Sequence, residues 1–323
     1  MDVLTLIWGK TVHFFGIIVV VTVLIAFVVM IIERCSLARK VAKAGKAEQD
    51  GRGSGRGTKR HVAIITGASS GLGANYARLI AARPEKYGID ELWLVARRRE
   101  RLEKLAQELP AASRVMALDL TREEDVERFR HALKKAAGSE AAEAENAAGF
   151  TVSILMNCAG FGRYGTSAEI GHEVENRMID INDKAAISLT DLCLPYMEAG
   201  ARIVQVCSVA ALQPIPTFNA YAASKALLYS YSRGLHIELL PRGISVTAVC
   251  PYWIHDTEFI EGASGEKKKP FFSTTSKKVA RRSLYDMQHH HALSTPGLIC
   301  TLDRIFAGLI PDELLGYLMT RFL

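Results

Sequence analysis

The sequence predicts an α/β protein, namely a doubly wound parallel sheet with helices on both faces, preceded by one transmembrane helix. From residue 61 onward, short apolar runs alternate with amphipathic runs, which is typical of a parallel sheet covered on both sides. A glycine-rich turn directly follows the first of these runs. Near the N-terminus, nineteen consecutive residues carry no charge. A chain of 323 residues suits one large domain with an appendage.

The uncharged segment, FFGIIVVVTVLIAFVVMII, covers residues 14–32. As a helix it would extend roughly 29 Å, close to the ~30 Å hydrocarbon core of a bilayer. A cleaved signal peptide would have a shorter apolar region and a small-residue cleavage site, and neither fits. A buried core helix is the alternative, but such a helix is rarely so uniformly aliphatic. Residues 1–33 are therefore predicted to be an N-terminal membrane anchor.

Residues 34–60 are predicted to be a basic, flexible linker. From residue 33 to residue 60 there are nine Lys and Arg against three acidic residues, which accounts for the whole formal charge of +6. Because five of these cations follow the span within residues 34–46, the positive-inside rule places the C-terminal part in the cytoplasm. The rest of the chain is neutral by count, so we expect contact with anionic lipid headgroups and no nucleic acid.

The remaining elements follow in chain order. Buried strands are predicted over residues 61–67, 91–97, 114–120, 152–160, 202–208 and 244–251. Amphipathic helices are predicted over residues 74–82, 99–109, 122–136 and 218–239. The low-complexity stretch 139–149 is predicted to be a surface extension. Six scattered cysteines without a CxxC pair indicate small buried side chains in a reducing compartment.

The glycine-rich turn indicates a dinucleotide site. In IITGASSGLGANYARLI, Gly67, Gly71 and Gly73 lie between the first strand and a helix. Glycines permit close backbone approach to a phosphate, and the helix N-terminus supplies free N–H donors. Ordinary tight turns also use glycine, but the strand–turn–helix context favours dinucleotide binding.

The second strand indicates which dinucleotide is bound. An adenosine ribose with a free 2′-hydroxyl is usually held by an acidic residue at the end of this strand. Here the sequence has Ala96, Arg97 and Arg98. Cations at this position suit a 2′-phosphate, so the sequence favours NADP(H) over NAD(H), although the arginines are also compatible with a solvated helix start.

These motifs, with several others in order, resemble the short-chain dehydrogenase/reductase family in its single-domain, Rossmann-like form. The match runs from about His61 to Thr257. TGASSGLG matches the family's TGxxxGxG, NCAG its NNAG and YAASK its YxxxK, while Tyr252 replaces the glycine of the family's PG. The resemblance implies a cofactor-binding set of Thr66, Gly67, Ser69, Ser70, Gly71, Leu72, Gly73, Arg97, Arg98, Asp119, Asn157, Ala159, Gly160, Tyr221, Lys225, Pro251 and Thr257.

The resemblance also implies four catalytic residues: Asn182, Ser208, Tyr221 and Lys225. A free tyrosine has a pKa near 10, and a nearby ammonium favours the phenolate, so Lys225 is placed to tune Tyr221. By the resemblance, Tyr221 is the general acid in reduction and the base in oxidation. Ser208 would bond the substrate oxygen, Lys225 would also hold the ribose hydroxyls, and Asn182 would hold a water.

The catalytic domain is predicted to cover residues 61–295, with substrate selectivity in the loop 252–295, and residues 296–323 to form an apolar helical tail. Leu298, Leu302, Ile305, Phe306 and Leu309 form a helical stripe expected to pack on the domain, or alternatively to border the substrate mouth. The basic–aromatic stretch 267–272 reads as a solvated loop or a membrane contact. Three consecutive histidines, residues 289–291, cannot face one point on a helix, so no metal site is predicted.

The predicted function is NADPH-dependent reduction of a ketone, or oxidation of the matching secondary alcohol, in a lipophilic substrate such as a steroid, 3-ketoacyl or sphingoid compound. A membrane-anchored, non-catalytic nucleotide-binding module and an extended-branch epimerase or dehydratase remain alternatives. The glycine spacing disfavours the epimerase, because position 70 is Ser. A homodimer is expected through the YxxxK helix, whose Leu227, Leu228, Tyr231 and Leu235 offer apolar surface.

Overall fold

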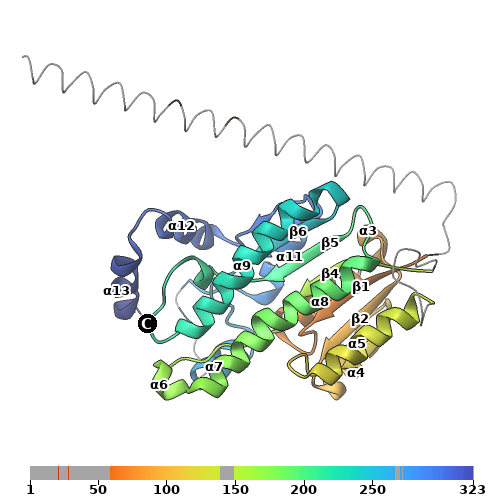
Figure 1. Ribbon diagram of the computed structural model, residues 1–323, viewed down its shortest axis with the longest axis horizontal. Helices are drawn as coiled ribbons and strands as arrows, with labels where there is room; N and C mark the ends of the chain where they lie inside the picture. The colour runs from red at the N-terminus through yellow and green to blue at the C-terminus, as the bar shows by residue number, and fades with distance from the viewer. Residues whose placement is uncertain are drawn as a thin grey trace, which may run out of the picture.

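A computed structural model of the chain describes Val21, Val28, residues 59–138, 149–265, Pro270 and residues 272–322. A single sheet of seven parallel strands runs through the domain in the order β3-β2-β1-β4-β5-β6-β7 (Figure 1). The strands are β1 (Arg60–Thr66), β2 (Glu91–Ala96), β3 (Ala112–Ala117), β4 (Phe150–Asn157), β5 (Arg202–Val206), β6 (Ser245–Val249) and β7 (Leu293–Ser294). The predicted doubly wound parallel sheet is confirmed.

Helices cover both faces of the sheet because its strands are apolar on both sides. On one face, Val62 and Ile64 of β1 pack in a core that includes Phe129 and Leu189. This face carries α5 (Glu123–Ala136), α8 (Ala185–Cys193) and α9 (Asn219–Leu239). The opposite face carries α2 (Gly71–Ala81), α4 (Arg99–Glu108) and α11 (Ser276–Gln288).

Shorter elements connect the strands and the larger helices at both ends of the sheet. They are α3 (Pro84–Tyr87), α6 (Ser167–Ile170), α7 (His172–Ile179), the π-helix η2 (Asp180–Lys184), η3 (Leu194–Tyr196), η4 (Val209–Leu212), η5 (Leu240–Arg242) and α10 (Phe259–Ser264). At the C-terminal end, α12 (Leu298–Ala307) and α13 (Asp312–Phe322) lie at the opposite end of the view from α4 and α5 (Figure 1).

The strand order reverses between β1 and β4. From β1 the sheet continues through β2 to β3 on one side, and from β4 through β5 to β7 on the other. In open parallel sheets, ligands bind at the carboxyl ends of the strands at this point of reversal. The predicted glycine turn and the NCAG segment follow β1 and β4 directly, so the fold brings them together there.

Several predictions fall outside the described residues. Apart from Val21 and Val28, these include the anchor and the linker up to residue 58, as well as residues 139–148, 266–269 and Phe271. Across the residues that are described, no helix combines the length and the apolar character needed to cross a membrane.

Two packing expectations are wrong. The stripe on α12 does not pack on the domain, because Leu298 and Leu309 are 73% and 76% exposed and the side chain that turns inward is Cys300. On α9, Leu228 and Leu235 are buried within the subunit, so neither is available to a partner. In both helices the register against neighbouring elements, which the spacing of apolar residues does not fix, decides which side is covered.

Candidate active site

A cavity of about 940 Å³ opens at the carboxyl ends of the strands. Its lining includes the glycine turn, the segment after β4, Ser208, Tyr221, Lys225 and the loop after β6. Of the sequence-predicted site residues, all line this cavity except Thr66, Asn157 and Asn182. The fold therefore gathers these residues from several separate stretches of chain into one site, whose volume lies within the ~300–1,000 Å³ range of ligand pockets.

The glycine turn is shaped for close backbone approach. Gly67 and Gly71 have φ values of 64° and 54°, which a residue with a Cβ rarely adopts. A Cβ on Gly73 would lie 2.4 Å from the Gly67 carbonyl oxygen, so only glycine fits there. Because the turn leads straight into the N-terminus of α2, its geometry fits the phosphates of a dinucleotide.

Thr66 and Asn157 support this turn from behind. The Thr66 hydroxyl accepts hydrogen bonds from the backbone N–H groups of Cys158 and Ala159, at 2.9 and 3.0 Å. The Asn157 amide donates to the Ala186 carbonyl and to the hydroxyl of Thr190, each at 3.1 Å. Both side chains are buried and join neighbouring elements. Their side chains therefore make bracing contacts, and the cofactor contacts that the resemblance implies for Thr66 and Asn157 stay a prediction.

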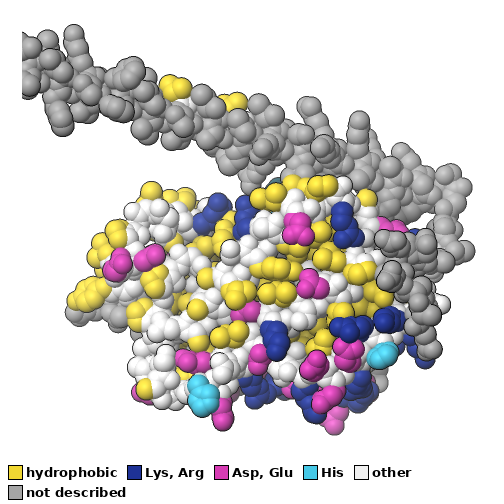
Figure 2. Space-filling view, in the orientation of Figure 1, with side chains coloured by type: hydrophobic (Ala, Val, Ile, Leu, Met, Phe, Trp, Pro, Cys, Tyr) yellow, Lys and Arg dark blue, Asp and Glu magenta, His cyan; other side chains and the backbone are white. Residues whose placement is uncertain are grey.

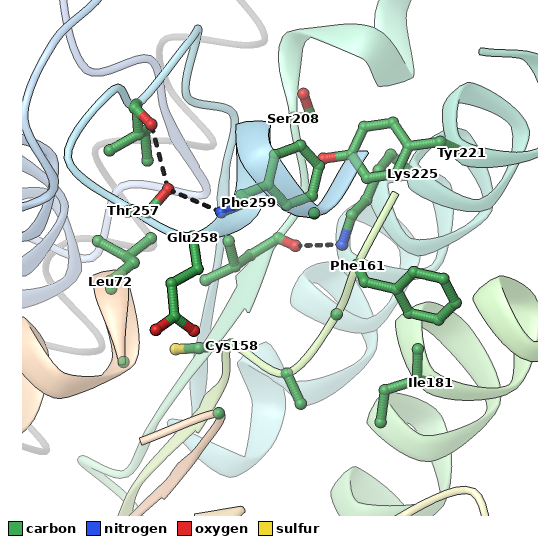
Figure 3. Close-up of a pocket in the computed structure, with 18 of the residues that line it drawn as sticks. Leu72, Cys158, Phe161, Ile181, Ser208, Tyr221, Lys225, Thr257, Glu258 and Phe259 are labelled. Atoms are coloured by element: carbon green, nitrogen blue, oxygen red, sulfur yellow. Dashed lines mark hydrogen bonds between the residues drawn. The ribbon is translucent and has the colours of Figure 1, made fainter. Parts of the chain in front are cut away.

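Tyr221 and Lys225 lie one turn apart at the start of α9, and both face the cavity (Figure 3). Lys225 Nζ donates to the Val206 carbonyl at 2.9 Å and lies 5.8 Å from the centre of the Tyr221 ring. Ser208 follows β5 and hydrogen-bonds to the Tyr221 hydroxyl. A hydroxyl that can exchange a proton, a second hydroxyl and an ammonium therefore meet at one end of the cavity.

Asn182 connects two of the segments that form the site. It is fully buried in the π-helix η2, and its amide donates to the Phe161 carbonyl and to Ser224 Oγ, each at 3.0 Å. Its Oδ1 accepts the Phe161 N–H at 3.0 Å, and a Cβ on Gly160 would come within 2.6 Å of that oxygen. Asn182 thus links the segment after β4 to the helix that carries Tyr221.

Burial dominates the electrostatics of this site. Desolvation raises the pKa of Tyr221, while its hydrogen bond to Ser208 acts in the opposite sense. Burial is thus the largest influence on the pKa of Tyr221, which is raised, whereas the sequence had suggested that Lys225 would lower it. Desolvation also lowers the pKa of Lys225. Asp183, next to Asn182, is 1% exposed, and burial raises its pKa to about 7 against the opposing charge of Lys225.

The end of the cavity beside the glycine turn carries the predicted cations. Arg97 and Arg98 both line it and are half-exposed. Arg97 Nη1 lies 4.0 Å from Asp119 Oδ2, and Asp119 Oδ1 accepts the Thr121 hydroxyl at 2.7 Å. Arg98 donates to the hydroxyls of Ser69 and Ser70 in the glycine turn. Two cations therefore stand beside the glycine turn at this end of the cavity.

Sequence reasoning assigned substrate selectivity to the loop 252–295, and it missed the aromatic rings of Tyr164 and Phe218 on the substrate side. Tyr221 stacks on Phe218 with a centroid distance of 4.3 Å, and Phe218 stacks on Tyr164 at 4.0 Å. Phe259 lies 5.3 Å from Tyr221, and Trp253 lies 6.0 Å from Tyr164. These rings come from three separate segments, around Tyr164, around Phe218 and over residues 252–259. Only the aromatic content of YWIHDTEF could have pointed to Trp253 and Phe259.

Comparisons with known proteins agree with this geometry. A profile of the short chain dehydrogenase family matches residues 61–268. The very-long-chain 3-oxoacyl-CoA reductase of Anas platyrhynchos is 31% identical over 203 residues, which are 59% of each chain. The sulfoacetaldehyde reductase of Chromohalobacter salexigens is 33% identical over 69% of this chain and 86% of its own. A short-chain dehydrogenase from Sphingobium yanoikuyae in complex with NADPH superimposes with a TM-score of 0.62, at 28% identity over 81% of this chain and 95% of its own.

Proposed function

The chain belongs to the short-chain dehydrogenase family and is an oxidoreductase that acts on CH–OH groups with NAD(P). From this premise we propose that it uses NADPH to reduce a ketone of a lipophilic substrate, or oxidises the matching secondary alcohol. The two relatives named above differ in substrate, one acting on a very-long-chain acyl thioester and the other on a small sulfonated aldehyde. The lining of this cavity therefore has to indicate the substrate class.

The aromatic wall around Tyr221 is the observation that carries the proposal. Phe218, Tyr164, Trp253 and Phe259 form a nearly continuous surface beside the reacting hydroxyl. Such rings favour an apolar substrate body, because each buried aromatic contact removes apolar area from water. The polar groups at the Ser208 end suit a single carbonyl oxygen that points toward Tyr221.

Charges beside the glycine turn support NADP(H) as the preferred cofactor. Ala96 ends β2 where an acidic residue would bind a free 2′-hydroxyl, and Arg97 and Arg98 follow it. In the proposed reaction the nicotinamide supplies the hydride, Tyr221 supplies the proton, and Lys225 holds its charge beside the phenol. Ser208 orients the substrate oxygen.

The same proposal includes a membrane location with the domain facing the cytoplasm. Residues 14–32 carry no charge, and basic residues follow them. On α12, Leu302, Ile305 and Phe306 are 42%, 51% and 54% exposed, and Asp303 on that helix accepts from the cavity residue Gln213 at 3.3 Å. Figure 2 shows hydrophobic side chains gathered at this end of the molecule. An apolar surface beside the cavity suits a substrate that arrives from lipid.

The test is a screen of the purified full chain for NADPH oxidation against lipophilic ketones, with short polar aldehydes as the comparison set. We expect turnover with the first set and preference for NADPH over NADH. The double variant Ala96→Asp, Arg97→Gln should shift the preference toward NADH, while Lys104→Gln on the exposed side of α4 serves as the charge control. Turnover confined to polar aldehydes, or tighter binding of NADH by the unmodified chain, would contradict the proposal.

A further inference from the structure

A carboxylate from the loop after β6 reaches across the cofactor side of the cavity. Glu258, just before α10, accepts a hydrogen bond from Arg98 Nη1 at 2.7 Å with its Oε2, and its Oε1 accepts from Arg101. Glu258 lines the cavity together with Arg98. In Figure 3 it lies near Thr257 and Leu72, on the opposite side of the view from Tyr221. It therefore joins the substrate loop to the start of α4.

Arg98 extends this link to the glycine turn. Its Nε and Nη2 donate to Ser69 Oγ at 3.2 and 3.0 Å, and Nη2 donates to Ser70 Oγ at 2.8 Å. One planar guanidinium thus connects the turn after β1, the start of α4 and the loop after β6. Among the described residues, Glu258 forms ion pairs with Arg98 and Arg101 alone.

Charge explains why an anion is favoured here. Arg98 is the N-cap of α4 and Arg101 lies in its first turn. Cations at a helix N-terminus are disfavoured by the helix dipole and by each other, so a neighbouring carboxylate stabilises them. The hydrogen bonds from Arg98 and then from Arg101 correspondingly lower the pKa of Glu258.

The loop already lies against the glycine turn. A Cβ on Gly71 would be 3.1 Å from Thr257 Cγ2, so the residue before Glu258 packs on the turn itself. The Glu258 side chain then continues over the cleft to the arginines. Glu258, Arg98 and the residues of the glycine turn all line the cavity, so this contact stands at the side of the site where the cofactor is expected.

We propose that Glu258, Arg98 and Arg101 form a clasp across the dinucleotide cleft, which opens for the cofactor to enter or leave and so limits its rate of exchange. Glu258 is thus a positioning residue, because it acts through the arginines and the loop rather than on the reacting atoms. The inference rests on the proposed function only in its use of a nicotinamide dinucleotide. Both NADPH and NADH have to pass the contact of Glu258 with Arg98 and Arg101.

Release rates of the bound cofactor test the clasp. The full chain is loaded with NADPH or NADH, and release is followed by stopped-flow fluorescence after mixing with excess oxidised cofactor. Because the three side chains are half-exposed, their ion pairs are weakened by solvent, and we expect Glu258→Gln to speed release of both cofactors by about three- to tenfold. Arg101→Gln, which leaves the glycine-turn contacts of Arg98 in place, should do the same. The double variant should release no faster than either single variant.

Arg99→Gln is the matched control, because Arg99 lies on the same turn of α4 and pairs with Glu103 at 3.5 Å instead of with Glu258. Its release rates should equal those of the unmodified chain. Release from Glu258→Gln and Arg101→Gln within about twofold of the unmodified chain, or additive effects in the double variant, would overturn the clasp. If NADH binds as tightly as NADPH, the proposed NADP(H) preference fails, while the NADH release rates still decide the clasp.

Discussion

Tyr221 is surrounded by aromatic rings and by few polar groups, which sets the conditions for its chemistry. Burial raises the pKa of its hydroxyl, and Ser208 provides the hydrogen bond that opposes this effect. The phenol is therefore held in its neutral form, ready to donate a proton to a substrate oxygen. The ammonium of Lys225, fixed by the Val206 carbonyl, is the nearby charge that favours loss of that proton.

Tyr221→Phe removes the transferable proton while keeping the ring and its stacking on Phe218. We expect turnover of an identified substrate to fall by about 10²–10⁴-fold, the usual contribution of positioned acid–base catalysis. NADPH binding, measured by fluorescence titration, should be retained. Lys225→Ala should reduce both turnover and cofactor affinity. Turnover by Tyr221→Phe close to that of the unmodified chain would eliminate the proposed role of this hydroxyl.

Asp183 makes the stability of the folded protein depend on pH. Because burial raises its pKa from 3.8 to about 7, the folded protein binds more protons at this residue than the unfolded chain between these values. The stabilising contribution is therefore full below pH 3.8 and is lost as the pH rises toward about 7.

We predict that Asp183→Asn removes this dependence. The quantity to compare is the free energy of unfolding of the variant minus that of the unmodified chain. This difference should increase by roughly 1–3 kcal/mol as the pH rises from the acidic to the neutral end of that range. Urea unfolding at several pH values measures it, with Asp180→Asn on the exposed side of η2 as the control. A constant difference between variant and unmodified chain across the range would show that Asp183 does not titrate as described.

Among the helices, α9 has a narrow exposed side that carries small and aliphatic side chains and little charge. Ala223, Leu227, Ser230, Gly234 and Ile237 are exposed at three- and four-residue spacing. Leu227 and Ile237 are 46% and 68% exposed. A straight face of small and aliphatic residues permits close approach of a second copy about a two-fold axis. This stripe replaces the set that included Leu228 and Leu235 as the proposed dimer surface.

Gly234→Arg tests the dimer. A Cβ at Gly234 meets nothing within 4 Å in the subunit, so the substitution should leave the fold intact while placing a charge in the interface. We expect sedimentation of the detergent-solubilised chain to change from dimer to monomer, whereas Gln107→Arg on α4 should have no effect. An unmodified chain that already sediments as a monomer would rule out the homodimer.

The order of apolar and basic residues at the N-terminus predicts how the whole molecule is oriented in the membrane, with the catalytic domain on the cytoplasmic side. Five cations follow the uncharged stretch within residues 34–46, and Lys10 precedes it. Protease added to sealed spheroplasts should therefore leave the catalytic domain intact, and should digest it once detergent opens the membrane. Digestion of the domain in sealed spheroplasts would reverse the orientation.

Local pattern determined the sheet and much of the site. Six strands were predicted because each is an apolar run long enough to be buried on both faces. The glycine turn was predicted because three glycines stand between a strand pattern and a helix pattern. The two-residue β7 carries too short a pattern to be recognised. The residues around YxxxK were identified by resemblance, since their approach in space depends on separate segments.

The tertiary structure alone decided which sides of α9 and α12 are covered, because helical spacing defines an apolar face without naming its neighbour. It also decided that Thr66 and Asn157 brace the site, that Asp183 is buried beside Lys225, and that Glu258 crosses to Arg98. Glu258 and Arg98 are 160 residues apart in the chain. Contacts of that kind arise from sheet order and loop packing, so no short stretch of sequence contains them, whereas the glycine turn is complete within eight consecutive residues.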